Sequence, residues 1–303
     1  MATNTSGPGS HPADRLLARI DRLKAPVCVG LDPVFERLPD ELRRGSDDLE
    51  TRVSAIASFS CALIEAVCEQ VPCLKIQAAC FERYGYLGVK AMGEVMRAAE
   101  ASDLEVILDF KRGDIGISAD HYAASAFDPP TDETCSQPGW VTINAYLGAD
   151  GIKPFLLRPD RGAFALVRTS NPSSDAIQER KLDDGRTVAE AVAGEVASIG
   201  SAHIGQRGYS SLGAVVGATK PQAALRLREI MPEQLFLVPG FGAQGGGADD
   251  VKPCFKPDGT GAIITASRSV IYAFEPGDAN WREAVTEAAA QLAERIGIIA
   301  GLR

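Results

Sequence analysis

The chain has 303 residues, a formal net charge of −9 and 45% hydrophobic residues, which is the composition of an ordinary globular domain. No apolar run reaches the roughly 18 residues that a membrane-spanning helix needs, and no basic patch with interleaved aromatic residues indicates nucleic-acid binding. This length suits two small domains or one α/β barrel, which typically needs about 250 residues.

The N-terminal segment 1–12 contains Ser, Gly and Pro and has no apolar core of the kind found in signal peptides. We therefore expect a flexible N-terminal arm over 1–12 and a single domain over 13–303. The seven cysteines are odd in number, form no C-x-x-C motif and lie partly in apolar runs. This usage favours reduced thiols in a cytoplasmic protein over a disulfide framework.

Short apolar runs alternate with helical patterns from about residue 26 to the end. Eight runs predict strands, at 27–31, 74–78, 105–110, 140–144, 163–169, 213–217, 235–238 and 262–266. Helical patterns lie between them, at 51–70, 87–101, 117–127, 151–157, 187–203, 221–231 and 281–299. Near-continuous apolar strands indicate a parallel sheet, and eight strand–helix units predict an α/β fold of the (β/α)8 TIM-barrel type. A doubly wound sheet is the alternative. The polar segments 129–139 and 171–186 are predicted to be loops.

The most informative segment is Asp109-Phe110-Lys111-Arg112-Gly113-Asp114-Ile115, which follows the apolar run 105–108. Alternation along a strand places Asp109 and Lys111 on one face. Two opposite charges at the end of an apolar strand, with a second carboxylate three residues later, are costly to bury without a function. Taken alone, the motif is also compatible with a structural ion pair and a turn.

Other predicted strands also carry polar residues near their C-terminal ends. The first ends in Asp32-Pro33, the second contains Lys75, the fifth ends in Ser170-Asn171-Pro172 and the eighth ends in Ser267-Arg268-Ser269. Each of these could separately be a turn, a cap or a lysine that extends to solvent. Because chemistry in a barrel collects at the C-terminal ends of the strands, their joint placement predicts an active site there.

A glycine-rich segment, 240–247, follows the seventh strand and matches G-x-G-x-x-G. A dinucleotide fingerprint opens a helix in the first βαβ unit, so its late position disfavours this interpretation. We interpret it as a flexible lid whose backbone N–H groups, together with Gln244, approach an anion that Arg268 also binds. His11, His121 and His203 have no metal-ligand spacing, so no metal site is predicted.

Together these motifs resemble the orotidine 5′-phosphate decarboxylase family, in particular its longer bacterial-type branch, over about residues 26–300. The matching segments are Val29-Gly30-Leu31-Asp32-Pro33, Leu74-Lys75, the DFKRGDI segment, Val141-Thr142-Ile143-Asn144, Arg168-Thr169-Ser170-Asn171-Pro172, PGFGAQGG and Ser267-Arg268. The resemblance implies decarboxylation of orotidine 5′-monophosphate to uridine 5′-monophosphate, the last step of de novo pyrimidine nucleotide synthesis, without a metal or cofactor. It also implies a homodimer with shared active sites.

The resemblance further implies a role for each matched residue. Lys111 would donate a proton to pyrimidine C6, Asp109 would lie beside the substrate carboxylate, and Lys75 and Asp114 would complete an alternating charge array, with Asp114 contributed by the partner subunit. The implied substrate contacts are Asp32 and Lys75 to the ribose, Ser170 to the pyrimidine edge, Gln244 and Arg268 to the phosphate, and Ile115 and Ser118 in the neighbouring pocket. Ser118 stands where the family often has Thr, and Ala145 where Pro is expected; neither change removes a reacting group.

Two alternatives remain open at this point. A magnesium-dependent sugar-phosphate decarboxylase or synthase of the same superfamily would share D-x-K-x-x-D, but typically has an acid where Lys75 stands, and a lysine there would repel a divalent ion. A non-catalytic barrel that binds a nucleoside monophosphate would not need the costly array of Asp109, Lys111 and Asp114.

Overall fold

Eight parallel strands form a closed barrel in which each strand pairs with its neighbours in chain order and β8 pairs with β1. The computed structural model describes residues 10–45, 47–128, 136–242, 247–275 and 277–303. The strands are β1 Val27–Leu31, β2 Cys73–Gln77, β3 Glu105–Arg112, β4 Trp140–Ile143, β5 Gly162–Arg168, β6 Leu212–Val216, β7 Phe236–Val238 and β8 Ala262–Ala266. All eight predicted strands are present, the predicted TIM barrel is confirmed, and the doubly wound alternative is wrong.

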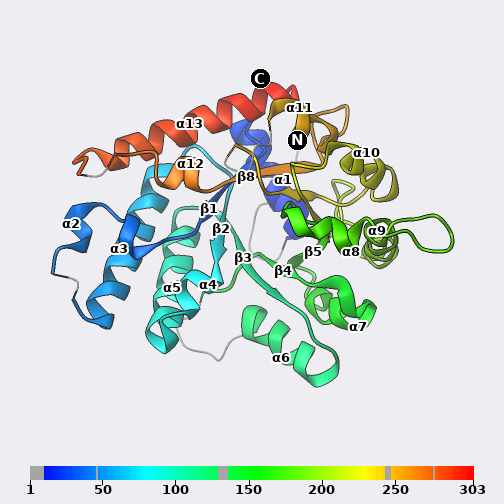
Figure 1. Ribbon diagram of the computed structural model, residues 1–303, viewed down its shortest axis with the longest axis horizontal. Coiled ribbons are helices and arrows are strands. Elements are labelled where there is room, and N and C mark those ends of the chain that lie inside the picture. The colour runs from blue at the N-terminus through cyan, green and yellow to red at the C-terminus, as the bar shows by residue number, and fades with distance from the viewer. Residues whose placement is uncertain (1–9, 46, 129–135, 243–246, 276) are drawn as a thin grey trace.

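The helices surround the barrel (Figure 1). They are α1 Pro12–Leu23, α2 Asp40–Arg43, α3 Leu49–Val67, α4 Ala78–Glu82, α5 Gly85–Ala101, α6 Gly116–Phe127, α7 Ala149–Ile152, α8 Asp175–Gln178, α9 Val188–Gly200, α10 Pro221–Ile230, α11 Ala248–Val251, α12 Arg268–Ile271 and α13 Trp281–Ala300. Short 3-10 turns lie at Phe35–Arg37, Ala145–Leu147, Lys153–Leu156, Pro172–Ser174 and Lys252–Cys254. Six of the predicted helical patterns correspond to α3, α5, α6, α9, α10 and α13, whereas the pattern at 151–157 overlaps the end of α7 and falls mainly on the 3-10 turn Lys153–Leu156.

Capping interactions explain why some helix ends differ from the predicted ones. The α9 helix begins one residue after Thr187, because the Thr187 hydroxyl accepts a hydrogen bond from Glu190 N at 3.1 Å and Thr187 N donates to the Glu190 carboxylate at 2.8 Å. This reciprocal pair satisfies two backbone donors at the helix start and stops the helix from extending further back.

Two regions contain short helical elements that were not predicted. The segment 171–186 includes a 3-10 turn and α8, and α11 forms just after the glycines that follow β7, with Gly247 N donating to the Asp250 carboxylate at 2.7 Å. Short polar helices of this kind give no apolar period and are therefore invisible to a periodicity argument. Residues 1–9, 129–135 and 243–246, which include most of the predicted arm and Gln244, lie outside the described residues.

Helix α1 was not predicted, since the helical patterns were expected to begin after residue 26. Its apolar side chains Leu16, Leu17 and Ile20 are buried and join the core at the N-terminal end of the barrel, against Trp140, Phe164 and other inward-facing residues. Full burial of one such side chain contributes about 1.5–3 kcal/mol. The helix thus closes this end of the barrel, and the opposite end remains for function.

The barrel interior next to helix α1 is packed by aromatic rings. Trp140 and Phe164 stack with their ring centroids 4.6 Å apart. A Cβ at Gly162 would lie 2.4 Å from the Trp140 ring, so only glycine fits at that position.

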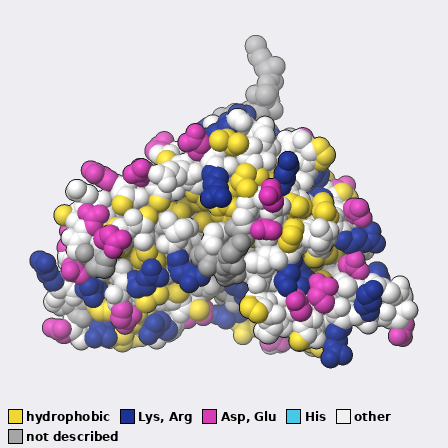
Figure 2. Space-filling view, turned by 45° about the horizontal axis from the view of Figure 1, so that its top comes forward, with side chains coloured by type: hydrophobic (Ala, Val, Ile, Leu, Met, Phe, Trp, Pro, Cys, Tyr) yellow, Lys and Arg dark blue, Asp and Glu magenta, His cyan; other side chains and the backbone are white. Residues whose placement is uncertain are grey.

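Among the described residues, no helix has the length and apolarity needed to cross a membrane. On the face shown in Figure 2, basic and acidic side chains are interspersed.

Candidate active site

The polar side chains predicted at the strand ends gather in one cavity at the C-terminal end of the barrel. This cavity has a volume of about 470 Å³ and lies in the size range of ligand-binding sites. Its lining includes Asp32 from β1's end, Lys75 from β2, Asp109 and Lys111 from β3, Ser170 beyond β5 and Arg268 from α12. The structure thus brings together six of the ten residues predicted to form the site.

Asp109 is the centre of a charge array on the cavity floor. Its Oδ2 lies 2.7 Å from Lys75 Nζ, and its Oδ1 lies 2.6 Å from Lys111 Nζ. Thr142 Oγ1 donates to the same Oδ1 at 2.7 Å, and Gln77 Nε2 donates to Oδ2 at 3.4 Å. Asp109 is therefore held on both carboxylate oxygens and cannot turn without breaking charge-assisted hydrogen bonds.

The electrostatic balance keeps Lys75 and Asp109 charged. Burial alone would lower the pKa of Lys75, but the carboxylates of Asp109 and Asp32 outweigh it and raise that pKa to about 12. Burial alone would raise the pKa of Asp109, but the ammonium groups of Lys75 and Lys111 outweigh it and hold that pKa well below its usual range. Opposite charges at hydrogen-bond distance thus overcome desolvation in both cases.

Lys111 differs from Lys75 in its access to the cavity. The Lys75 side chain is only 9% exposed, whereas that of Lys111 is 46% exposed. Both ammonium groups contact Asp109, but only the Lys111 ammonium also reaches open space. A ligand in the cavity would therefore meet Lys111 Nζ directly, with Asp109 beside it.

Two buried oxygen atoms on the β8–β1 side of the cavity have no hydrogen-bond partner among the described residues. These are Asp32 Oδ1, which lies 3.7 Å from Lys75 Nζ, and Thr265 Oγ1 on β8. A buried polar atom without a partner is costly unless a ligand or water satisfies it. This side of the cavity is accordingly prepared for ligand hydroxyl groups.

Ser170 and Arg268 lie on the rim of the same cavity. Ser170 packs so closely on β6's end that a Cβ at Gly217 would lie 2.8 Å from the Ser170 backbone, so Gly217 allows this approach. Arg268 is exposed and has no ion-pair partner among the described residues. An unpaired guanidinium at the start of a helical turn, after β8, suits an anionic ligand group.

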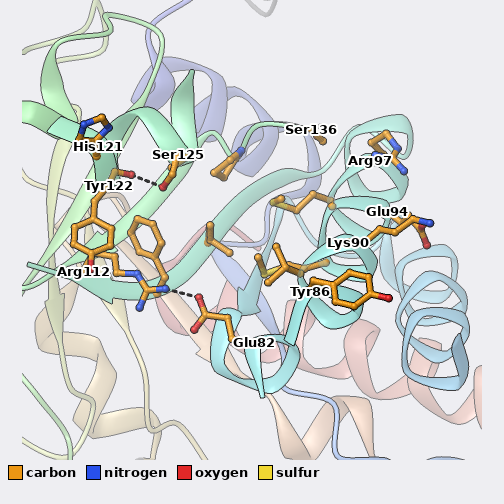
Figure 3. Close-up of a pocket in the computed structure, with 18 of the residues that line it drawn as sticks. Glu82, Tyr86, Lys90, Glu94, Arg97, Arg112, His121, Tyr122, Ser125 and Ser136 are labelled. Carbon is orange, nitrogen blue, oxygen red and sulfur yellow. Dashed lines mark hydrogen bonds and ion pairs between the residues drawn. The ribbon is translucent and has the colours of Figure 1, made fainter. Parts of the chain in front are cut away.

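Four predicted site residues do not join this cavity within the chain. Gln244 lies outside the described residues. Asp114 and Ser118 line a different cavity of about 840 Å³ on the outer face of β3, between α5 and α6, and Ile115 lies on the surface with 54% exposure. Figure 3 shows that this outer cavity is bordered by Tyr86, Lys90 and Arg97 on one side and His121 and Tyr122 on the other.

The outer cavity lacks the chemistry of the inner one. Its best-defined ion pair joins Arg112 to Glu82, drawn as a dashed line in Figure 3. Arg112 also lies over the rings of Phe110 and Tyr122, with its guanidinium carbon 5.4 Å and 5.5 Å from their centroids. These contacts are typical of a structural cation on a helix–strand interface. The candidate reacting centre is therefore the smaller inner cavity.

Sequence reasoning assigned no role to Gln77, Thr142 and Thr265, which the structure places in the inner cavity. All three are polar residues at positions of their strands that face the barrel interior. Because side chains alternate along a strand, the parity that places Lys75 inside also places Gln77 inside. The signal was present, but an isolated Thr in an apolar strand is too common to stand out.

Comparisons with known proteins agree with this geometry. Residues 25–282 match the model of the "Orotidine 5'-phosphate decarboxylase / HUMPS family". The orotidine 5′-phosphate decarboxylase of Rhodopirellula baltica is 39% identical over 94% of this chain and 98% of its own, and that of Caldicellulosiruptor bescii is 38% identical over 87% and 90%. The solved OMP decarboxylase of Leishmania donovani is 33% identical with a TM-score of 0.76, covering 96% of this chain and 99% of its own. The chain belongs to the orotidine 5′-phosphate decarboxylase / HUMPS family.

Proposed function

We propose that this chain decarboxylates orotidine 5′-monophosphate to uridine 5′-monophosphate, the last step of de novo pyrimidine nucleotide synthesis. The observation that carries the proposal is the accessible ammonium of Lys111 held 2.6 Å from Asp109 on the floor of the cavity. The relatives named orotidine 5′-phosphate decarboxylase, matched over nearly the whole chain, support it.

The reaction needs a fixed cation beside the reacting carbon. When the bond from C6 to the carboxylate breaks, its electron pair stays on C6 and carbon dioxide leaves. Lys111 stabilises the developing negative charge and transfers one ammonium proton to C6, which gives the product. Asp109 orients Lys111 and lies beside the departing carboxylate, while Lys75 keeps Asp109 ionised.

The remaining groups bind the parts of the substrate that do not react. Asp32 and Lys75 bind ribose hydroxyls, since Asp32 Oδ1 is a buried acceptor without a partner among the described residues. Ser170 binds the edge of the pyrimidine, and Arg268, with Gln244, binds the phosphate. Binding energy from this remote phosphate can offset the cost of desolvating and orienting the reacting centre.

The position of Lys75 favours this function over a magnesium-dependent sugar-phosphate enzyme of the same superfamily. Its ammonium lies 2.7 Å from Asp109 and 3.7 Å from Asp32, in the position between carboxylates where a divalent ion would bind. The Lys75 ammonium would strongly repel a divalent ion at this position, because the site is shielded from water. We therefore propose that the fixed cations of the protein take the place of a metal ion.

The direct test follows the absorbance of orotidine 5′-monophosphate on incubation with the purified protein, before and after exhaustive chelation. We expect substrate loss at the same rate in both samples. Activity that disappears on chelation and returns with magnesium would favour the sugar-phosphate enzyme instead. A folded protein that binds uridine 5′-monophosphate without any turnover would indicate a non-catalytic binding barrel.

We also propose a homodimer in which each active site is completed by Asp114 of the other chain. Within one chain, the Asp114 side chain lies on the outer face of β3, where its Oδ1 accepts a hydrogen bond from Ile115 N at 2.9 Å. The hydrophobic residues nearby are exposed, among them Ile115, Ile117 and Tyr146. Exposed apolar side chains next to the Asp114 segment support an interface at this place.

Hybrid dimers test this assembly. Lys111→Ala and Asp114→Asn are each expected to be nearly inactive, but in a hybrid one pocket carries both lesions and the other is intact. Random exchange makes half of the dimers hybrid, so mixing should recover about a quarter of wild-type activity per chain. Native mass spectrometry must first demonstrate exchange. Activity that stays at the level of the separate variants would mean that Asp114 acts within its own chain.

The cytoplasm is the compartment that we propose for this protein. The six described cysteines, Cys28, Cys61, Cys68, Cys73, Cys80 and Cys254, are free thiols. Free thiols persist in a reducing compartment, whereas an oxidising one favours disulfides. A thiol titration of protein purified under native conditions would count all cysteines as reduced if this placement is right.

A further inference from the structure

The hydrogen-bond ladder between β3 and β4 is interrupted beside the charge array. Leu108 pairs with Val141 and Arg112 with Ile143, and the register shifts between these two pairs. Three residues of β3, at 109–111, therefore oppose a single residue of β4, Thr142. A bulge of this kind frees backbone groups from the ladder and redirects side chains, and bulges are frequent beside active sites.

Lys111 lies within this bulge in an unusual backbone conformation. Its φ angle is 48°, in the left-handed region that a residue with a Cβ rarely adopts. Such a conformation persists only where the surrounding structure holds it in place. Lys111, which a ligand in the cavity would meet directly, thus needs other residues to hold its backbone in place.

The hydroxyl of Thr142 provides this restraint. Thr142 Oγ1 accepts a hydrogen bond from Lys111 N at 3.1 Å and donates its own hydrogen to Asp109 Oδ1 at 2.7 Å. A threonine hydroxyl has one hydrogen to donate, so the donation to the carboxylate leaves its lone pairs for the Lys111 N–H. Thr142 is buried, so water does not compete for either bond.

We propose that Thr142 is a positioning residue, which fixes Lys111 Nζ and the Asp109 carboxylate relative to each other through one hydroxyl across the β3 bulge. The proposal rests on the decarboxylase function given above. Thr142 itself need not touch the reacting atoms; it holds the backbone of one reacting group and the side chain of the other. Loss of the hydroxyl should therefore affect the chemical step more than substrate binding.

Thr142→Val is the main test, because Val has the same shape and lacks the hydroxyl. We expect kcat for orotidine 5′-monophosphate to fall about 10- to 100-fold and KM to change by less than about threefold, since ribose and phosphate contacts lie elsewhere. Thr142→Ser restores the hydroxyl and should return kcat to within about threefold of wild type. Thr142→Ala removes the same hydroxyl without the methyl groups and covers the case in which the Val variant does not fold.

Ser210→Ala is a matched control for the loss of a buried hydroxyl. Ser210 Oγ also makes one donated and one accepted bond, to Gly200 O at 2.8 Å and from Leu212 N at 3.0 Å, but it precedes β6 at the opposite end of the barrel. We expect Ser210→Ala to lower thermal stability as Thr142→Val does and to leave kcat and KM unchanged. An equal fall in kcat for both variants would overturn the positioning role.

Amide hydrogen exchange gives a readout that does not depend on turnover. The Lys111 amide should exchange at least about tenfold faster in Thr142→Val than in wild type, and near the wild-type rate in Thr142→Ser. If the wild-type protein shows no turnover, the decarboxylase function is refuted. The exchange rate of the Lys111 amide would still test its hydrogen bond to Thr142. Unchanged exchange at Lys111, or unchanged kcat in an active Thr142→Val variant, would overturn the proposal.

Discussion

Replacement of Lys75 by Met tests whether the charge array behaves as one coupled unit. Lys75 Nζ lies 2.7 Å from Asp109 Oδ2, and the two side chains are only 9% and 6% exposed. Met fills a similar volume without charge, so it leaves the Asp109 carboxylate buried with one cation fewer. Removal of one partner of a buried ion pair costs about 3–5 kcal/mol. Because Lys111 remains 2.6 Å from Asp109, we expect the lower end, about 3 kcal/mol, for the loss in unfolding free energy.

A double-mutant cycle separates charge coupling from lost packing. Asp109→Asn leaves the Lys75 ammonium buried without its main partner and should be destabilising by a similar amount. The double variant buries neither charge. Its loss in unfolding free energy should therefore be smaller than the sum of the two single-variant losses by about 2 kcal/mol. Urea unfolding followed by circular dichroism at pH 7 measures all four proteins. Losses that add to within about 0.5 kcal/mol would refute the coupling.

The difference in unfolding free energy between wild type and Lys75→Met should depend on pH in a defined direction. The pKa of Lys75 is raised from 10.5 to about 12, so its stabilisation is complete below 10.5 and is lost as pH rises through 12. The pKa of Asp109 is lowered from 3.8, so its stabilisation is complete above that value and is lost at more acidic pH. The stability gap between wild type and Lys75→Met should therefore be constant between about pH 5 and 9 and narrow on either side. A gap that changes steadily across neutral pH would contradict these assignments.

Three further variants test separate parts of the molecule. Lys111→Ala should abolish turnover while calorimetry still detects uridine 5′-monophosphate binding, because phosphate and base contacts lie elsewhere; substantial residual turnover would exclude a proton-donor role. Arg268→Ala should raise KM about 10- to 100-fold, and orotidine without its phosphate should react more slowly still; equal rates for orotidine and its monophosphate would remove the phosphate site. Leu16→Ala in α1 should lower the unfolding free energy by about 2–5 kcal/mol in a denaturant titration with kcat unchanged, and a fall in kcat would mean that the two ends of the barrel are coupled.

The barrel could be predicted because parallel strands buried on both faces leave a strong trace in a sequence. Strand β1 and strand β8 were predicted with their observed bounds, and β2 to within one residue at each end. The alternation of such runs with helical periods then leaves few possible topologies. Helix α1 was missed although Ala13, Leu16, Leu17 and Ile20 recur at helical spacing, because it precedes β1 and therefore lies outside the strand–helix alternation from which the helices were predicted.

The candidate site was predictable in part for the same reason. Strand parity and strand ends predicted Lys75, Asp109 and Lys111 in one place, and the structure joins them through carboxylate contacts of 2.6–2.7 Å. The β3 bulge could not be predicted, because it depends on the register between β3 and β4, which no local pattern in either strand records. Thr142 therefore gained a role only when the two strands were seen side by side.

The floor of the cavity is divided into two chemically different halves, and this division connects the fold to the reaction. Strands β2 to β4 contribute Lys75, Asp109 and Thr142, whereas β5, β6 and β7 contribute Leu166, Val215 and Leu237 at the facing positions. In the proposed reaction, charge on one side fixes where the substrate carboxylate and Lys111 meet. In the proposed reaction, the apolar side offers water no hydrogen-bond partners and lowers the effective dielectric, so each fixed charge acts more strongly on the developing carbanion. A barrel can hold both halves together because its strands surround one interior, and alternate strands supply the inward-facing residues of each layer.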